Sequence, residues 1–505
     1  MSRSHAWVGA AVAVAAVAGM TLPAVAATGA APPAPSPRGE IRPVPAAPTT
    51  VASYTLIAPA TTSKSQLVAR AILRPGRPCP PLLTRTAAGA PWRSTATTQR
   101  SVGPLAAPAF ASVKVCSAMV PVGVTQATLG GRQIPAAIPA SVTRIGITAD
   151  SGCKVKGSKI QDCNNGGWPL AGMAAGLASM RPQVVFEPGD YYYRDEACPK
   201  ASWAKCGVTP PVEPTPGMPF TDNAHGWLVD AITPMTPLFA AAPLALLRGN
   251  HEACDRAGNG FFLFFDPRLE TATECEPVDN GGTLEPPKEQ VTPPWTFTLP
   301  VAQGRALKVA MVDTAYGSDD TISKWAKKGH EVYLQADAMT TPQPGIESWL
   351  MTHRPLFGRT PGNGEAPNYT PWASNNQAAG SQGLLGHYQM VLSSHIHLLQ
   401  AVQIKGLPPN LIVGAGGTML DPRGDFSIPG FGPLAKSDGT AIDPKYPPYP
   451  TASMLWTKVR YGFGIATASP TRNAWNVELQ GLGSTHLATC KLRNPTGTAP
   501  DLACS

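Results

Sequence analysis

The sequence predicts an α/β layered domain preceded by a small all-β domain. From about residue 141 onward, strand-like apolar runs alternate with helix-like runs, a pattern typical of α/β domains. Polar residues rich in Asp, Asn and His follow the predicted strands of this region. Before residue 141, short runs with β-branched residues are separated by clusters of Pro, Gly and Thr, which favours strands without helices.

The N-terminus is predicted to be a secretory signal peptide over residues 1–26. Arg3 and His5 precede an apolar run, mostly Ala and Val, at residues 6–18, and Ala24–Ala26 offers a small-residue cleavage site. A transmembrane anchor is the alternative, but the run is shorter than the roughly 20 apolar residues of a membrane span. We therefore expect a secreted protein, periplasmic or extracellular, with no membrane span after cleavage.

The 10 cysteines are expected to form disulfides, because export leads to an oxidising compartment and the count is even. A zinc site is the alternative, but the chain contains no C-x-x-C pair. Connectivity does not follow from sequence alone. Sequence proximity favours pairing Cys153 with Cys163, Cys198 with Cys206, Cys254 with Cys275 and Cys490 with Cys504, which leaves Cys79 for Cys116.

The residues between the signal and the α/β region are expected to form a linker and then a β domain. Residues 27–50 are dominated by Pro and Ala, a composition typical of an extended linker. Residues 51–140 are predicted to form a β-sandwich-like domain without catalytic residues. Its clearest apolar runs are Tyr54–Ile57, Leu67–Leu73 and Ala111–Val115.

The charge distribution does not indicate nucleic-acid binding. The chain has 40 Lys and Arg against 32 Asp and Glu, a mildly basic net charge of +8. The basic residues are dispersed and are not interleaved with aromatic residues, so we expect no nucleic-acid-binding module. The excess favours anionic substrates only weakly.

The first half of the α/β region is predicted to contain three strands and two helices. Pro169 suits the first turn of the first helix, and Arg181-Pro182 follows its end. The predicted strands are Arg144–Ala149, Val184–Phe186 and Leu244–Leu247, and the helices are Trp168–Met180 and about Asp230–Ala241.

Polar side chains follow successive predicted strands, including two later ones that end near residues 352 and 392. In α/β sheets, ligands bind at the carboxyl ends of the strands. Two cations held about 3.5–4 Å apart need one shared carboxylate and several oxygen and nitrogen donors. The strand ends supply such a set: Asp150, Asp190, Tyr193, Asn250, His251, Glu252, His353, His395 and His397.

Five short motifs carry these residues: Asp150–Gly152, Gly189–Tyr193, Gly249–Glu252, Leu350–His353 and Ser394–His397. Together they resemble the calcineurin-like metallophosphoesterases, and within them the purple acid phosphatases. The resemblance covers about residues 144–417. It implies a four-layer αββα metallophosphoesterase sandwich over residues 141–480, followed by a tail at 481–505 with Cys490 and Cys504. The β domain also looks like the N-terminal domain of secreted bacterial relatives.

Two metal sites follow from the resemblance, with Asp190 as the shared ligand. It implies that Asp190 and Tyr193 hold Fe(III), with the tyrosine as phenolate, and that the second metal is Fe, Zn or Mn. Two positions depart from the superfamily pattern: Ser394 replaces a Gly, and Gly152 stands where most members have His. The implied ligands are Asp150, Asp190, Tyr193 and His397 for one metal, and Asp190, Asn250, His353 and His395 for the other.

The expected reaction is hydrolysis of small phosphate esters by a metal-bound hydroxide, in the manner of an acid phosphatase. His251 is expected to protonate or stabilise the leaving oxygen. In the alternative interpretation, His251 is a structural residue hydrogen-bonded to a neighbouring carboxylate. Arg194 and Arg354 flank ligands and are candidates for phosphate contact, with salt bridges as the alternative. A phosphodiesterase or nucleotidase on the same site remains open, and so does an inactive cell-surface binding protein.

Overall fold

The computed structural model describes residues 50–59, 65–164, 166–207, 212–213, 221–270, 272–276, 278–280, 283–285, 290–316, 324–359, 371–372, 377, 380–421, 426–431, 452–470, 474–493 and 500–505. The predicted signal peptide and the linker up to residue 49 lie outside these ranges. No helix within them is long and apolar enough to cross a membrane.

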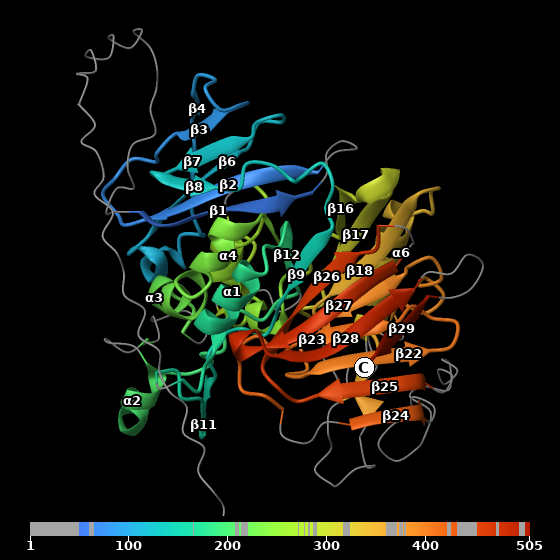
Figure 1. Ribbon diagram of the computed structural model, residues 1–505. Coiled ribbons are helices and arrows are strands. Elements are labelled where there is room, and N and C mark those ends of the chain that lie inside the picture. The colour runs from blue at the N-terminus through green and yellow to red at the C-terminus, as the bar shows by residue number, and fades with distance from the viewer. Residues whose placement is uncertain are drawn as a thin grey trace, which may run out of the picture. The chain divides into compact units, whose positions relative to one another are not determined.

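Two large sheets dominate the described chain (Figure 1). The first has the order β29 (Asp501–Cys504), β28 (His486–Arg493), β27 (Ala474–Gly481), β26 (Gly462–Ala468), β9 (Arg144–Ile147), β12 (Val184–Glu187), β13 (Leu244–Leu246), β1 (Thr50–Ala58), β2 (Gln66–Leu73), β6 (Lys114–Met119) and β5 (Thr98–Arg100). The second has the order β16 (Trp295–Pro300), β17 (Ala306–Val312), β18 (Ile346–Thr352), β21 (Met390–Ser393), β23 (Asn410–Val413), β22 (Leu399–Ile404), β25 (Ala452–Lys458) and β24 (Phe426–Phe431).

The two sheets share one apolar core. Phe186 of β12 meets Phe297 of β16 edge to face, with ring centroids 5.7 Å apart. Trp349 of β18 meets Trp475 of β27 in the same way at 5.0 Å. Such aromatic pairs add stability beyond the area they bury. The prediction of an α/β fold is confirmed.

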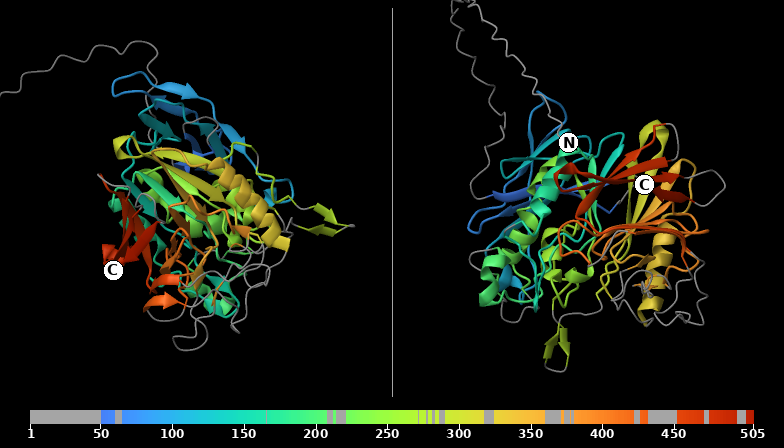
Figure 2. Two further views of the ribbon diagram at one scale, coloured as in Figure 1. Left: turned by 90° about the vertical axis from the view of Figure 1, so that its right-hand side faces the viewer. Right: turned by 60° about the horizontal axis from the view of Figure 1, so that its bottom comes forward.

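Helices cover the other face of each sheet (Figure 2). In α1 (Leu170–Ser179), the buried positions Leu170, Met173, Ala174 and Leu177 have the spacing of one helix face, and they share a core cluster with residues of β12 and β26. Helix α4 (Thr236–Ala241) joins the same cluster, whereas α6 (Lys324–Met339) packs against β17 and β21.

The predicted elements correspond closely to the observed ones, with one correction. The helix expected at about Asp230–Ala241 is instead α3 (Ala224–Trp227), a π-helical turn at Leu228–Ile232 and then α4. Pro237 within the first turn of α4 explains why a new helix begins there. All five disulfides form with the expected pairing.

The boundary expected near residue 140 is not found in the structure. Strand β1 pairs in parallel with β13 through Leu56 and Leu244, so β1, β2, β6 and β5 continue the first sheet. Only β4 (Arg93–Thr95), β3 (Leu82–Arg85), β7 (Gln126–Leu129) and β8 (Arg132–Ile134) form a separate small sheet. A separate all-β domain is therefore not confirmed. The C-terminal tail is likewise partly structured, because β28 and β29 lie in the first sheet.

Candidate metal centre

The expected ligands come from loops that follow parallel strands. In the first sheet β9, β12 and β13 are parallel, and in the second β17, β18 and β21 are parallel. Parallel neighbours end at the same edge of a sheet, so the loops after them meet. Asp150 follows β9, Asp190 and Tyr193 follow β12, Asn250 follows β13, His353 follows β18, and His395 and His397 follow β21.

One donor group is centred on the phenol of Tyr193. Its oxygen lies 2.6 Å from Asp150 Oδ1, 2.8 Å from Asp190 Oδ2 and 3.0 Å from His397 Nε2. All four residues are buried. The expected ligands of the first metal are thus brought together.

A second donor group is centred on His353. Its Nε2 atom lies 3.0 Å from Asn250 Oδ1, 3.1 Å from His395 Nδ1 and 3.2 Å from Asp190 Oδ2. Ligand atoms of Asp190, His353 and His395 all lie within 4.8 Å of one another. The same oxygen, Asp190 Oδ2, therefore touches both donor groups.

Three of these residues adopt a backbone conformation that is uncommon outside glycine. The φ angles are 54° for Asp150, 62° for Asp190 and 73° for His395. Non-glycine residues in this region cost roughly 1–3 kcal/mol each, and such strain clusters at functional sites. The conformation persists only because the surrounding hydrogen bonds enforce it.

Glu252 accepts several of the hydrogen bonds that hold the backbone around Asp190. Its Oε2 atom accepts from Asp190 N at 2.9 Å and Gly249 N at 3.0 Å. Its Oε1 atom accepts from Tyr191 N at 2.9 Å and Tyr192 N at 3.2 Å. In the sequence, Glu252 belongs to a motif but has no assigned role. Its four hydrogen bonds to backbone N–H groups become apparent only in the tertiary structure.

Gly152 lies directly against the backbone that carries Tyr193. A Cβ atom at this position would lie 2.5 Å from Tyr191 O and 2.9 Å from Tyr193 N. No side chain fits there without moving the backbone that carries Tyr193. The phenol of Tyr193 instead lies beside Asp150 and His397.

The site contains buried carboxylates whose negative charge bound cations would neutralise. Burial, and then the charge of Asp190, raises the pKa of Asp150 well above its usual range. Burial also raises the pKa of Tyr193, with Asp150 and Asp190 adding to the effect. Within the described residues, no Lys or Arg pairs with either carboxylate. Buried carboxylates are normally paired or bound to metal, and this oxygen-rich and nitrogen-containing set fits two metal ions.

His251 lies against this centre and is oriented by Asp195. Its backbone N–H donates to Asp190 Oδ1 at 2.8 Å, and its ring lies over Tyr193 with centroids 3.9 Å apart. Its Nδ1 atom lies 3.1 Å from Asp195 Oδ1. Asp195 also pairs with Arg256 at 2.9 Å and Lys156 at 3.1 Å. Asp195 belongs to none of the five sequence motifs, although it stands two residues after Tyr193.

The two arginines expected to contact phosphate both have partners within the protein. The guanidinium of Arg194 is 2% exposed and pairs with Asp230 at 2.8 Å. Arg354 is buried, and its Nη1 atom donates to the carbonyl oxygens of Thr314 and Tyr316. The ion-pair alternative therefore holds for Arg194, and Arg354 holds backbone carbonyls.

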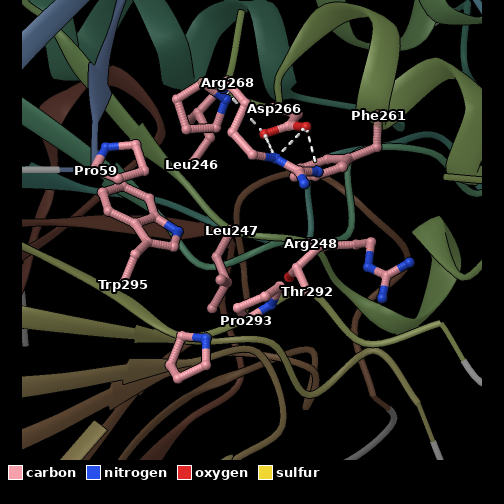
Figure 3. Close-up of a pocket in the computed structure, with 12 residues that line it drawn as sticks. Pro59, Leu246, Leu247, Arg248, Phe261, Asp266, Arg268, Thr292, Pro293 and Trp295 are labelled. Carbon is pink, nitrogen blue, oxygen red and sulfur yellow. Dashed lines mark hydrogen bonds and ion pairs between the residues drawn. The ribbon is translucent and has the colours of Figure 1, made fainter. Parts of the chain in front are cut away.

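A cavity of about 250 Å³ lies apart from the ligand residues (Figure 3). It is lined mainly by apolar side chains, among them Leu246, Phe261 and Trp295. At its rim, Arg268 pairs with Asp266 at 2.6 Å. None of the expected ligands lines it, so the cavity is distinct from the candidate metal centre.

The chain has the fold of the calcineurin-like metallophosphoesterases. The structure is similar to a purple acid phosphatase, PPD1, from yellow lupin seeds, with a TM-score of 0.50 and 11% sequence identity over 87% of this chain and 74% of that one. PhoD matches with a TM-score of 0.48 and 11% identity over 90% of this chain and 91% of that chain. No protein-family model and no curated protein matches the sequence.

Proposed function

We propose that the chain is an exported phosphoesterase with two metal ions, acid phosphatase-like in its preference for phosphomonoesters. One observation carries the proposal: Asp190 Oδ2 lies 2.8 Å from the phenol of Tyr193 and 3.2 Å from Nε2 of His353. A single carboxylate oxygen shared by two donor groups is the arrangement that a pair of cations requires. The four-layer αββα sandwich is part of the proposal, supported by the shared core and the outer helices.

Each donor group suits a different metal. Asp150, Asp190, Tyr193 and His397 would hold Fe(III), because phenolate and carboxylate oxygens are hard anionic donors. Asp190, Asn250, His353 and His395 mix nitrogen and oxygen and would hold Fe, Zn or Mn. When bound, such cations lower the pKa of a coordinated water and neutralise phosphoryl oxygens.

The protein's own residues complete the reaction. His251 would donate a proton to the leaving oxygen, or a hydrogen bond that stabilises it. Asp195 fixes the ring by its contact with Nδ1, which leaves Nε2 without a hydrogen-bond partner among the residues that the structure describes. Asp195 therefore acts as a positioning residue for His251.

Export is supported by the disulfides. Five bridges form and no free cysteine occurs in the described chain, as expected for an oxidising compartment. Two of the bridges, Cys153–Cys163 and Cys198–Cys206, lie in loops that directly follow ligand segments.

The test is turnover of p-nitrophenyl phosphate, of bis(p-nitrophenyl) phosphate and of a nucleotide, each with and without a chelator. Fast, chelator-sensitive hydrolysis of the monoester is expected. Faster turnover of the bis ester would favour a phosphodiesterase, and faster turnover of the nucleotide a nucleotidase. No turnover by protein that contains two equivalents of metal would refute the enzyme and favour a binding protein.

A further inference from the structure

A serine side chain lies behind His353, the residue at the centre of the second donor group. Ser394 Oγ lies 2.9 Å from His353 Nδ1 and 3.1 Å from the carbonyl oxygen of Pro188. Both Ser394 and His353 are fully buried. In the superfamily pattern the position of Ser394 is a glycine, which has no side chain. The hydroxyl contact is therefore a feature of this chain that the pattern does not supply.

The contacts of His353 decide which of its ring nitrogens carries the hydrogen. Pro188 O lies 2.9 Å from Nδ1, and a carbonyl oxygen can only accept, so Nδ1 is the protonated nitrogen. In a neutral imidazole, Nε2 then keeps its lone pair. Nε2 is the atom that lies among the other ligand atoms of the second donor group. This tautomer is the one that binds a metal through Nε2.

The hydroxyl of Ser394 supports this tautomer with two hydrogen bonds. It can accept from the Nδ1–H of His353 and donate its own hydrogen to Pro188 O, because a hydroxyl does both. The Nδ1–H is then shared between two acceptors, which fixes the plane of the ring more firmly than one acceptor does. Partners on the outer nitrogen of a metal-binding histidine orient the ring and raise the basicity of the inner nitrogen.

The backbone of Ser394 connects the two loops that carry the histidines of the second donor group. Ser394 follows β21 directly, and its N–H donates to His353 O at 2.9 Å. The next residue, His395, has a φ of 73°. Alanine at position 394 would keep these backbone contacts and remove only the hydroxyl, whereas glycine would also add conformational freedom.

The corresponding histidine of the first donor group has different partners. His397 Nδ1 lies 2.9 Å from Met419 O and 3.9 Å from Asp421 Oδ1. The hydrogen bonds of the Ser394 hydroxyl go to His353 and Pro188, and neither of these residues belongs to the first donor group. Loss of the hydroxyl should therefore act on the second position.

We infer that Ser394 is a positioning residue for the second metal: its hydroxyl holds the ring of His353 and thereby strengthens metal binding among Asn250, His353 and His395. The inference rests on the proposed function, because it assumes two metal positions. It adds that this chain has an outer hydrogen bond at the second position in place of the superfamily glycine.

The experiment compares Ser394→Ala and Ser394→Gly with the matched control Ser393→Ala in full-length protein. Ser393 is the preceding residue and is equally buried, but its Oγ accepts from Asn410 Nδ2 at 2.6 Å. Metal is first removed with a chelator, and Zn²⁺ is then titrated in competition with a chelator of known affinity. His353→Ala shows which of the two binding steps belongs to the second position. Denaturant titration of the metal-free proteins measures their stability.

Ser394→Ala is expected to raise the Kd of the second Zn²⁺ by about tenfold, the low end of the effect of losing an outer partner, because Pro188 O remains as an acceptor. Ser394→Gly should lose at least as much. The Kd of the first Zn²⁺ should change by less than about threefold, since the ligands of that position keep their own partners. Ser393→Ala should leave both constants within about twofold of wild type, whatever it does to the stability of the metal-free protein.

Wild-type affinity for both Zn²⁺ ions in Ser394→Ala would overturn the inference. Equal losses at both positions would also overturn it, and so would an equal loss in Ser393→Ala, because the hydroxyl would then support only the scaffold. Wild-type protein that binds two Zn²⁺ ions and hydrolyses no phosphate ester would refute the proposed function instead, and the titration would still decide the role of Ser394. Wild-type protein that binds fewer than two ions would overturn both.

Discussion

Replacing Glu252 with Gln tests whether one buried carboxylate holds the bridging residue in its strained conformation. The two carboxylate oxygens accept four backbone N–H groups, two each. Glutamine keeps one oxygen and replaces the other with an NH₂ group, which cannot accept. Two buried N–H donors then face another donor. At about 1–3 kcal/mol for each unsatisfied group, the free energy of unfolding should fall by roughly 2–6 kcal/mol.

The same change should loosen Asp190, whose N–H is one of the four donors and whose φ is 62°. We expect Glu252→Gln to lose metal from both positions, since Asp190 touches both donor groups. Denaturant titration would measure the stability, and elemental analysis the metal content. Because metal bound at Asp190 would itself stabilise the fold, both measurements are made on metal-loaded and on chelated protein.

Glu187→Gln is the matched control, because Glu187 is an equally buried glutamate in the neighbouring strand end. Its Oε1 atom accepts only from Ser151 Oγ, and its Oε2 atom has no hydrogen-bond partner among the described atoms. This substitution should therefore not lower stability at neutral pH. Wild-type stability and two metal equivalents in Glu252→Gln would refute the assigned role of Glu252.

Three further predictions concern the same region. Asp190→Asn should fold but retain neither metal and show no hydrolysis; retention of two equivalents would refute the bridge. Tyr193→Phe should lack the visible absorption band that a ferric phenolate gives the wild type; an active wild type with neither iron nor a band would exclude iron at this position. Burial raises the pKa of Glu187 from 4.5 to about 8, so ionisation opposes folding. Burial of the neutral form therefore contributes fully to the free energy of unfolding below pH 4.5. This contribution is lost as the pH rises through 8, which lowers the free energy of unfolding by at most about 5 kcal/mol. Glu187→Gln should therefore gain stability relative to wild type between pH 5 and pH 9, and a constant difference over that range would contradict the burial argument.

Local sequence patterns were sufficient for the strands and for the grouping of polar residues at their ends. The apolar runs before Asp150, Asp190 and His353 form β9, β12 and β18, and within each sheet parallel pairing brings the ends of neighbouring strands to the same edge. The disulfide pairs also followed from proximity in sequence, because short loops close most readily. Neither inference required knowledge of distant contacts.

Long-range contacts decided what the sequence could not. The strand at Thr50–Ala58 reads as part of a separate β domain, yet its partner β13 lies almost 190 residues later, as the pairing of Leu56 with Leu244 shows. The role of Arg194 depended on Asp230, which comes to it through the packing of a different helical segment. The charge of a side chain follows from its residue type, but the tertiary structure determines which residue pairs with it. For that reason the sequence alone determined which residues gather at the candidate metal centre, whereas only the tertiary structure decided that Arg194 is paired with Asp230.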